Sequence, residues 1–278
     1  MSGESRGTVT LDHVGLLVPD LTRAAEDFAA LGFTLTPRAA HLDGDGNHAG
    51  SEQCSIMLRD GYVELQEITG PPGSHLLSRA QAKHFGLHII AFGVADARAA
   101  ARDITGLPLS PVMDWSRPVR RPGVEGEARF SFFVADYDPA DEALLCWTQH
   151  RTPELLRDAA VLDHANGAHA IAGFRVYCEP SREATLAARL VAAGGTAVAG
   201  GVRFGAAEIA IGPGSLPRVD WPAAPFCGDL RISVAETGAA ATAARSRGFA
   251  VETHGDATCL DLLDPYGIRL VLEINDPA

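Results

Sequence analysis

The sequence has little of what marks several large classes of protein. Its 278 residues include a single lysine, Lys83, and carry a formal net charge of -12. That charge disfavours binding to nucleic acid or to an anionic membrane. A Schiff-base mechanism would have to use the one lysine. No apolar run approaches the roughly 18 residues of a membrane span, and the polar N-terminus has no signal-peptide core. We therefore expect a cytoplasmic protein that binds neither nucleic acid nor membranes.

Cysteine pairs and common catalytic motifs are also missing. The five cysteines are widely spaced and form no CxxC pair, which fits reduced, buried thiols better than a disulfide framework or a structural zinc site. There is no GxSxG elbow, no Walker loop and no GxGxxG motif after a strand pattern. Serine-hydrolase and nucleotide-binding chemistry are therefore without support.

What the sequence does contain is a repeat. The stretch LDHVGLLVPDLTRAAEDFAALGF, from Leu11, predicts a strand, an alanine-rich helix capped by Asp20 or Thr22, and a helix end at Gly32. Similar stretches begin at His88, Ile171 and Leu230. Repeats of this size indicate recurring supersecondary units.

The second part of each unit predicts further strands. CSIMLRDGYVELQEI joins two apolar runs through Asp60-Gly61, a hairpin signal. CLDLLDPYGIRLVLEI does the same near the C-terminus, with its turn at residues 264–267. The second and third units show the pair less cleanly. The unit is therefore interpreted as strand, helix and three strands, four times over.

This pattern resembles the vicinal oxygen chelate superfamily, which includes glyoxalase-like, bleomycin-resistance and dioxygenase proteins. The resemblance implies an α+β fold of four βαβββ modules that form two half-open β-barrels. Modules 1 and 2 would form a first glyoxalase-like domain over residues 8–150. A connector over 151–168 would lead to a second such domain, modules 3 and 4, over 169–278.

The resemblance also implies a metal site inside the first barrel. In the superfamily the first strand of a module supplies a ligand where His13 stands, and the last strand supplies a glutamate where Glu64 stands. Alternate residues of a strand share a face, so Tyr62, Glu64 and Gln66 should point the same way as each other. A histidine and a carboxylate suit a divalent metal such as Zn, Ni, Mn or Fe. A hydrogen-bonded core histidine is the competing interpretation of His13.

The second module departs from this pattern. Counting along its first strand places Ile89 at the ligand position, and His88 is one residue away, on the opposite face. Its last strand has no glutamate, and His150 or Gln149 would have to replace it. The predicted metal ligands are therefore His13, Glu64 and His150. The second barrel lacks histidines at ligand positions, which counts against extradiol dioxygenase chemistry.

The leading interpretation is a metal-assisted lyase or isomerase acting on a small molecule with vicinal oxygens. Glu64 or His150 would move the proton, and Arg117, Arg129 and Trp147 would bind the substrate. Three alternatives stay open: a metal-free binding or resistance protein, a metal-free acid–base enzyme, and a dioxygenase. Homodimers are common in the fold, so a homodimer is also compatible with the sequence.

Overall fold

A computed structural model describes residues 9–71, 73–138, 141–213 and 225–275. The ends of the predicted domains at residues 8 and 278 lie outside these ranges. Each of β1, β5, β9 and β13 is followed by a helix and then by three further strands. The elements up to residue 150 are β1 (Thr10–Leu17), α1 (Leu21–Ala30), β2 (Ala39–Leu42), β3 (His48–Met57), β4 (Tyr62–Ile68), α2 (Ser78–Gln81), β5 (Gly86–Gly93), α3 (Ala97–Asp103), β6 (Met113–Arg121), β7 (Val124–Val134) and β8 (Leu144–His150).

A short connector and eight more strands complete the described chain. The connector holds a 3-10 turn, η1 (Pro153–Leu155), and α4 (Ala159–Leu162). The remaining elements are β9 (Ala170–Tyr177), η2 (Pro180–Arg182), α5 (Glu183–Ala192), β10 (Thr196–Val198), β11 (Gly201–Phe204), β12 (Ala207–Gly212), β13 (Phe226–Val234), α6 (Gly238–Ser246), β14 (Ala250–His254), β15 (Ala257–Leu262), α7 (Leu263–Tyr266) and β16 (Ile268–Ile274).

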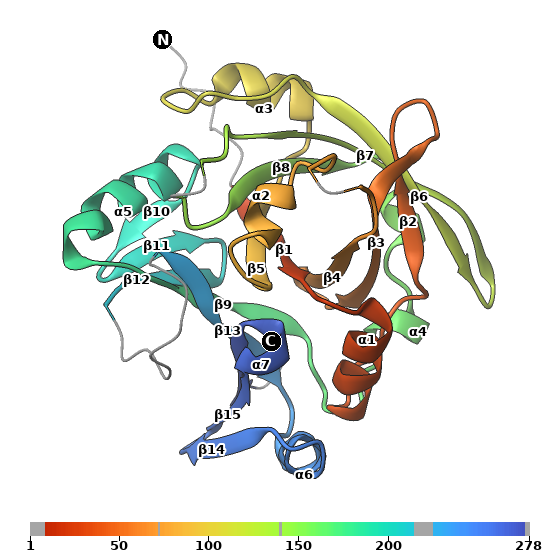
Figure 1. Ribbon diagram of the computed structural model, residues 1–278, viewed down its shortest axis with the longest axis vertical. Coiled ribbons are helices and arrows are strands. Elements are labelled where there is room, and N and C mark those ends of the chain that lie inside the picture. The colour runs from red at the N-terminus through yellow and green to blue at the C-terminus, as the bar shows by residue number, and fades with distance from the viewer. Residues whose placement is uncertain (1–8, 72, 139–140, 214–224, 276–278) are drawn as a thin grey trace.

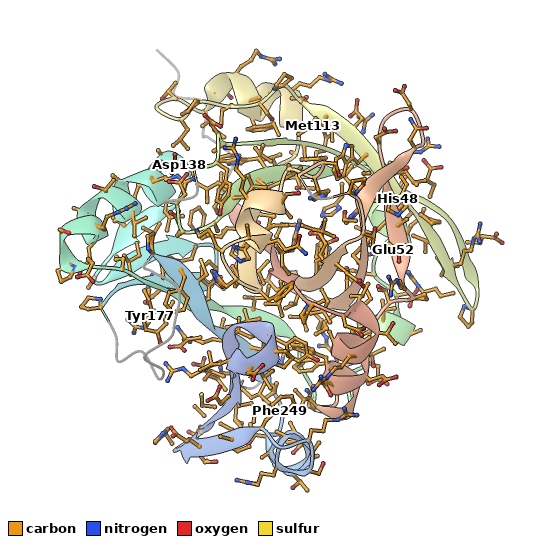
Figure 2. All side chains as sticks on the ribbon, in the orientation of Figure 1. His48, Glu52, Met113, Asp138, Tyr177 and Phe249 are labelled. Carbon is orange, nitrogen blue, oxygen red and sulfur yellow. The ribbon has the colours of Figure 1, made fainter. Side chains whose placement is uncertain are left out.

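The first eight strands form a closed barrel. They pair in the order β1-β4-β3-β2-β6-β7-β8-β5, and β5 returns to pair with β1. The sequence analysis predicts a half-open barrel, whereas the observed barrel is closed. It comes from the long antiparallel β1–β5 pairing and from one residue pair, Leu42 with Ser116, between β2 and β6. Closing the ring removes exposed strand edges. Side chains fill its interior, as Figure 2 shows.

The second eight strands form an open sheet beside this barrel (Figure 1). β13 pairs with β9 and with β16, and in the described ranges its strand pairing with the barrel is one residue pair, Cys227 with Leu87 of β5. Within the described ranges, β10 and β14 at the two ends are not paired with each other. One apolar core runs through both halves and includes Leu16 of β1 and Leu272 of β16.

The faces of β1 follow the predicted alternation. Val14, Leu16 and Val18 lie in the shared core outside the barrel. His13 lies inside it. The predicted cap is also confirmed, because the Asp20 carboxylate accepts a hydrogen bond from the backbone N–H of Arg23 at 3.0 Å. The cap fixes where α1 begins, directly after the strand. Within the strand, alternation places His13 on the interior face.

A pair of neighbouring histidines, His88 fully buried and His84 half-buried, lies where β5 meets the second half. The rings of His84 and His88 are 4.3 Å apart, and His84 also contacts Phe226 of β13. Nε2 of His88 donates to the carbonyl of His84 at 2.8 Å. Burial lowers the pKa of His88 to about 3 and that of His84 to about 4. Both rings are therefore neutral in the folded protein at neutral pH.

We expect this pair to make the fold sensitive to mild acid. Below pH 6.5 an unfolded histidine binds a proton that folded His88 does not take up until about pH 3. The stabilisation is thus complete above pH 6.5 and is lost as the pH falls. His88 alone should cost about 2 kcal/mol of unfolding free energy at pH 5. Urea denaturation at pH 7.5 and 5.0 measures the loss. The loss of unfolding free energy between the two pH values should be smaller in His88→Gln and unchanged in a His254→Gln control. Equal losses in the parent protein and both variants would contradict the assignment to His88.

Candidate functional site

The barrel interior contains a small chamber of about 80 Å³. β1, β2 and β4 contribute histidine, tyrosine, glutamate and glutamine side chains, and β5 to β8 contribute mostly aromatic and aliphatic ones together with Arg117 and Thr148. The residues that line it are His13, His41, Tyr62, Glu64, Gln66, His75, Leu76, Leu77, Ile89, Trp115, Arg117, Phe130, Phe132, Val134, Leu144, Cys146 and Thr148. The shared face predicted for Tyr62, Glu64 and Gln66 is confirmed.

His13 is held as one end of a carboxylate–imidazole pair. Its Nδ1 donates to the Asp12 carboxylate at 2.8 Å, and its ring stacks on Tyr62 with centroids 4.3 Å apart. His150 donates to the same Asp12 oxygen from Nε2 at 2.9 Å. These two imidazoles lower the pKa of Asp12 against the opposing effect of its burial. The other ring nitrogen of His13, Nε2, lies 4.0 Å from an oxygen of Glu64.

Glu64 lies between two histidines. Nε2 of His41, on β2, donates to Glu64 at 3.1 Å, and Nδ1 of His41 accepts from the Ser51 hydroxyl at 3.0 Å. Burial alone would raise the pKa of Glu64, but His41, His13 and Arg117 together lower it to about 2. Glu64 is therefore a carboxylate at neutral pH and can accept a hydrogen bond from a ligand hydroxyl group.

Arg117 brings a positive charge into this apolar interior. It is 5% exposed, lines the chamber from β6, and donates to the Ser55 hydroxyl at 3.2 Å. A guanidinium keeps its charge when buried and has donors to spare. Arg117 can therefore stabilise negative charge that develops on a ligand oxygen. The structure places Arg117 in the chamber lining, and its role in substrate binding stays a prediction.

The predicted metal ligands are only partly brought together. His13 and Glu64 face each other, but His150 turns its Nε2 to Asp12 and does not line the chamber. Across the described ranges, no group of three or more His, Cys, Asp or Glu side chains is arranged to hold a metal ion. The residues as placed therefore do not fit a metal centre.

The second module explains why the set is incomplete. In the first module, β1 and β4 pair His13 with Tyr62 and Gly15 with Glu64. In the second module, β5 and β8 pair in the same way, with Ile89 in the place of His13 and Cys146 in the place of Glu64. Both of these line the chamber where further ligands would stand. Burial raises the pKa of Cys146 to about 12, so this thiol is protonated in the folded protein.

Two predicted substrate-binding residues lie elsewhere. Trp147 is fully buried in the shared core, where its Nε1 donates to the carbonyl of Ala193. It alternates along β8 with Cys146 and Thr148, and those two face the chamber instead. Arg129 lines a separate surface cleft, and its side chain is 64% exposed beside Glu127. Neither side chain lines the chamber.

Sequence reasoning missed Asp12 and His41. Asp12 directly precedes His13 and would be expected on the opposite face, but the pairing of β1 with β5 shifts register between Leu11 and His13. That irregularity lets neighbouring side chains meet. His41 belongs to a four-residue strand without a clear sequence pattern. The only signal is that AAHLD contains a histidine between small and apolar residues.

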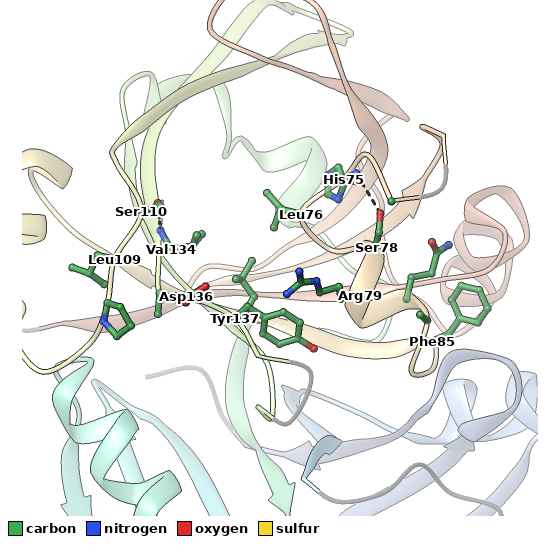
Figure 3. A pocket seen from close by; sticks show the side chains of 16 residues that line it. His75, Leu76, Ser78, Arg79, Phe85, Leu109, Ser110, Val134, Asp136 and Tyr137 are labelled. Atoms are coloured by element: carbon green, nitrogen blue, oxygen red, sulfur yellow. Dashed lines mark hydrogen bonds between the residues drawn. The ribbon is translucent and has the colours of Figure 1, made fainter.

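A second, larger cavity adjoins the chamber. It is an open cleft of about 1040 Å³, called the outer cleft below, between α2 and the strands around β7 (Figure 3). The two cavities share four lining residues, which form the throat: His75, Leu76, Val134 and Leu144. The segment between β4 and β5 therefore separates the chamber from the surface.

Comparison with known proteins supports the family predicted from the sequence. Residues 11–193 match the family described as glyoxalase-like domain. No match was found among curated protein sequences. No helix in the described part of the chain is long and apolar enough to cross a membrane.

Solved structures share the fold at low sequence identity. A triple mutant of 4-hydroxymandelate synthase from Streptomyces coelicolor aligns with a TM-score of 0.60 and 13% identity, over 98% of this chain and 94% of that one. A catechol 2,3-dioxygenase aligns with a TM-score of 0.57 and 13% identity, over 98% and 96% of the two chains. At such identity the likeness concerns the fold alone. Since the family match covers about two thirds of the chain, this protein belongs to the glyoxalase-like domain family.

Proposed function

We propose that the protein is a small-molecule enzyme that transfers a proton next to a carbonyl group, as an isomerase or a lyase, in the chamber of its first two βαβββ modules. The observation that carries this proposal is the pair of Asp12 and His13. One nitrogen of the imidazole is bound to a buried carboxylate, and the other is free beside Glu64. That arrangement is typical of a general acid–base histidine.

Each polar residue of the chamber has a separate role in the proposed reaction. A substrate carbonyl oxygen would face Arg117, and a neighbouring hydroxyl would donate to the Glu64 carboxylate, which His41 holds in place. Nε2 of His13 would accept the proton from carbon, and the Asp12 carboxylate would stabilise the resulting imidazolium. The electron pair of the C–H bond forms a carbon–carbon double bond, and the π pair of the carbonyl group moves to its oxygen. The imidazolium then returns the proton to a neighbouring atom or to a leaving group.

A metal-assisted form of the reaction is the second candidate. It is favoured by the nitrogens of His13 and His41 that face the Glu64 carboxylate from two sides, a nitrogen–oxygen donor set that divalent metals accept. Zn, Ni, Mn and Fe are the metals to test. Because these three side chains are not arranged as a group that could hold a metal ion in the described part of the chain, the proton-transfer proposal rests on the protein side chains alone.

Solvent deuterium exchange tests the proposal. The purified protein is incubated in deuterated buffer with a panel of 2-oxo and 2-hydroxycarbonyl compounds, and NMR follows loss of the proton next to the carbonyl. We expect exchange with at least one compound, before and after treatment with a chelator. Exchange that disappears with the chelator and returns with one metal would establish the metal-assisted form. Saturable binding without exchange would identify a binding protein and reject the enzyme.

A further inference from the structure

We propose that the ligand is an elongated amphipathic molecule with three parts: a compact oxygen-bearing head in the chamber, an oxygen acceptor bound to Nε2 of His75 in the throat, and an apolar tail in the outer cleft. The proposal rests on the proposed function for the position of the head. It makes His75 and Leu76 the residues that select the length and chemistry of the substrate.

The sizes of the two cavities require an extended ligand. The chamber holds about 80 Å³, far below the roughly 300–1,000 Å³ of pockets that enclose a drug-sized ligand. The outer cleft, with about 1040 Å³, has ample room, but it is open to solvent and contains none of the candidate acid–base residues. A molecule that uses the chemistry of the chamber and also gains affinity from surface buried in the outer cleft passes through the throat.

His75 leaves a hydrogen-bond donor unused in that throat. Its Nδ1 accepts from the backbone N–H of Leu77 at 3.1 Å, which places the ring proton on Nε2. The residue is 6% exposed, and Nε2 is buried without a partner. Burial lowers the pKa of His75 to about 4, so the ring is neutral with a single N–H. Since buried donors are rarely left unpaired, the throat is matched to a ligand oxygen.

The outer cleft favours an apolar tail. Leu76 lines both cavities and is 37% exposed, one of three large hydrophobic side chains that are exposed in the described part of the chain. Figure 3 shows it beside His75, with Leu109, Val134 and Tyr137 on the opposite wall. Arg79 and Asp136 also line the cleft, but a polar tail would leave the leucine, valine and tyrosine side chains exposed to water.

Pyruvate esters of increasing chain length test the proposal by calorimetric titration. Methyl, butyl and hexyl pyruvate share a compact head of neighbouring oxygens and an ester group, and they differ only in the tail. Each buried methylene strengthens binding by up to about fourfold, so hexyl pyruvate should bind at least about tenfold more tightly than methyl pyruvate. In Leu76→Trp this dependence on length should vanish.

Two further variants separate the parts. Val191→Trp adds the same bulk to an exposed position on α5 and should bind like the parent protein. His75→Phe keeps a flat ring but removes the donor, and it should weaken all three esters by a similar factor of about three to ten. Binding that ignores chain length in the parent protein, or a length dependence that survives in Leu76→Trp, would overturn the proposal.

These measurements are independent of turnover. A protein that shows the length dependence but exchanges no proton would reject the proposed function and keep the ligand class. A protein that exchanges protons but binds all three esters equally would do the reverse.

Discussion

His13→Gln is expected to lower the rate of deuterium exchange by about 10²- to 10⁴-fold, the usual contribution of a positioned general base. Glutamine keeps a polar side chain of similar length against Tyr62 but cannot take up a proton. The affinity for the compound that exchanges should change little, because Arg117, His41 and Glu64 remain in the chamber. NMR exchange rates and calorimetric dissociation constants measure the two quantities separately.

Variants of the neighbouring residues make this expectation specific. Asp12→Asn keeps the size of the side chain that holds Nδ1 of His13 but removes its charge, and we expect kcat to fall while KM stays near its original value. His150→Gln removes only the second donor to Asp12 and should have a much smaller effect. If His150→Gln abolished exchange and His13→Gln retained it, His150 would be the proton carrier, one of the two roles that the sequence predicts for it.

The sequence predicts the repeating strands and the inward side chains because both follow from local pattern. The alternation of apolar residues in β1 fixes which side chains enter the core, and the same period places Glu64 and Gln66 inside the barrel. It also places Ile89, rather than His88, on the chamber wall. The alternation distinguishes neighbouring residues clearly, because a shift of one residue moves a side chain to the other face of the strand.

The remaining parts of the site depend on contacts between distant segments. His41 meets Glu64 across 23 positions in the chain, and His75 joins the throat from a segment with no strong pattern. Asp12 reaches His13 only because the β1–β5 pairing is irregular. Trp147 shows a different kind of error. It is next to chamber residues in the sequence, but its side chain lies on the core face of its strand.

Gly173→Ala is expected to destabilise the fold severely, with a loss of at least about 4 kcal/mol of unfolding free energy. Gly173 pairs with Glu208 of β12 and has φ of +145°. A Cβ there would lie 1.9 Å from the carbonyl oxygen of Glu208, so the two strands would have to separate. Gly248→Ala is the matched control, since its φ is also positive, at +85°, but nothing lies within 4 Å. Urea midpoints compare the two variants.

The same variant shows how the two predicted domains depend on each other. If residues 8–150 and 169–278 were independent, Gly173→Ala would melt only the second and leave ligand binding in the chamber intact. The packing favours one cooperative unit. A single core crosses both halves, and the buried carboxylate of Asp27 on α1 accepts from Arg247 and Tyr266 in the second half. We therefore expect one urea transition, in which chamber binding and the second sheet are lost together. The reason is that losing a strand from a shared core exposes that core in both halves. Two separate transitions would instead show that the halves fold independently.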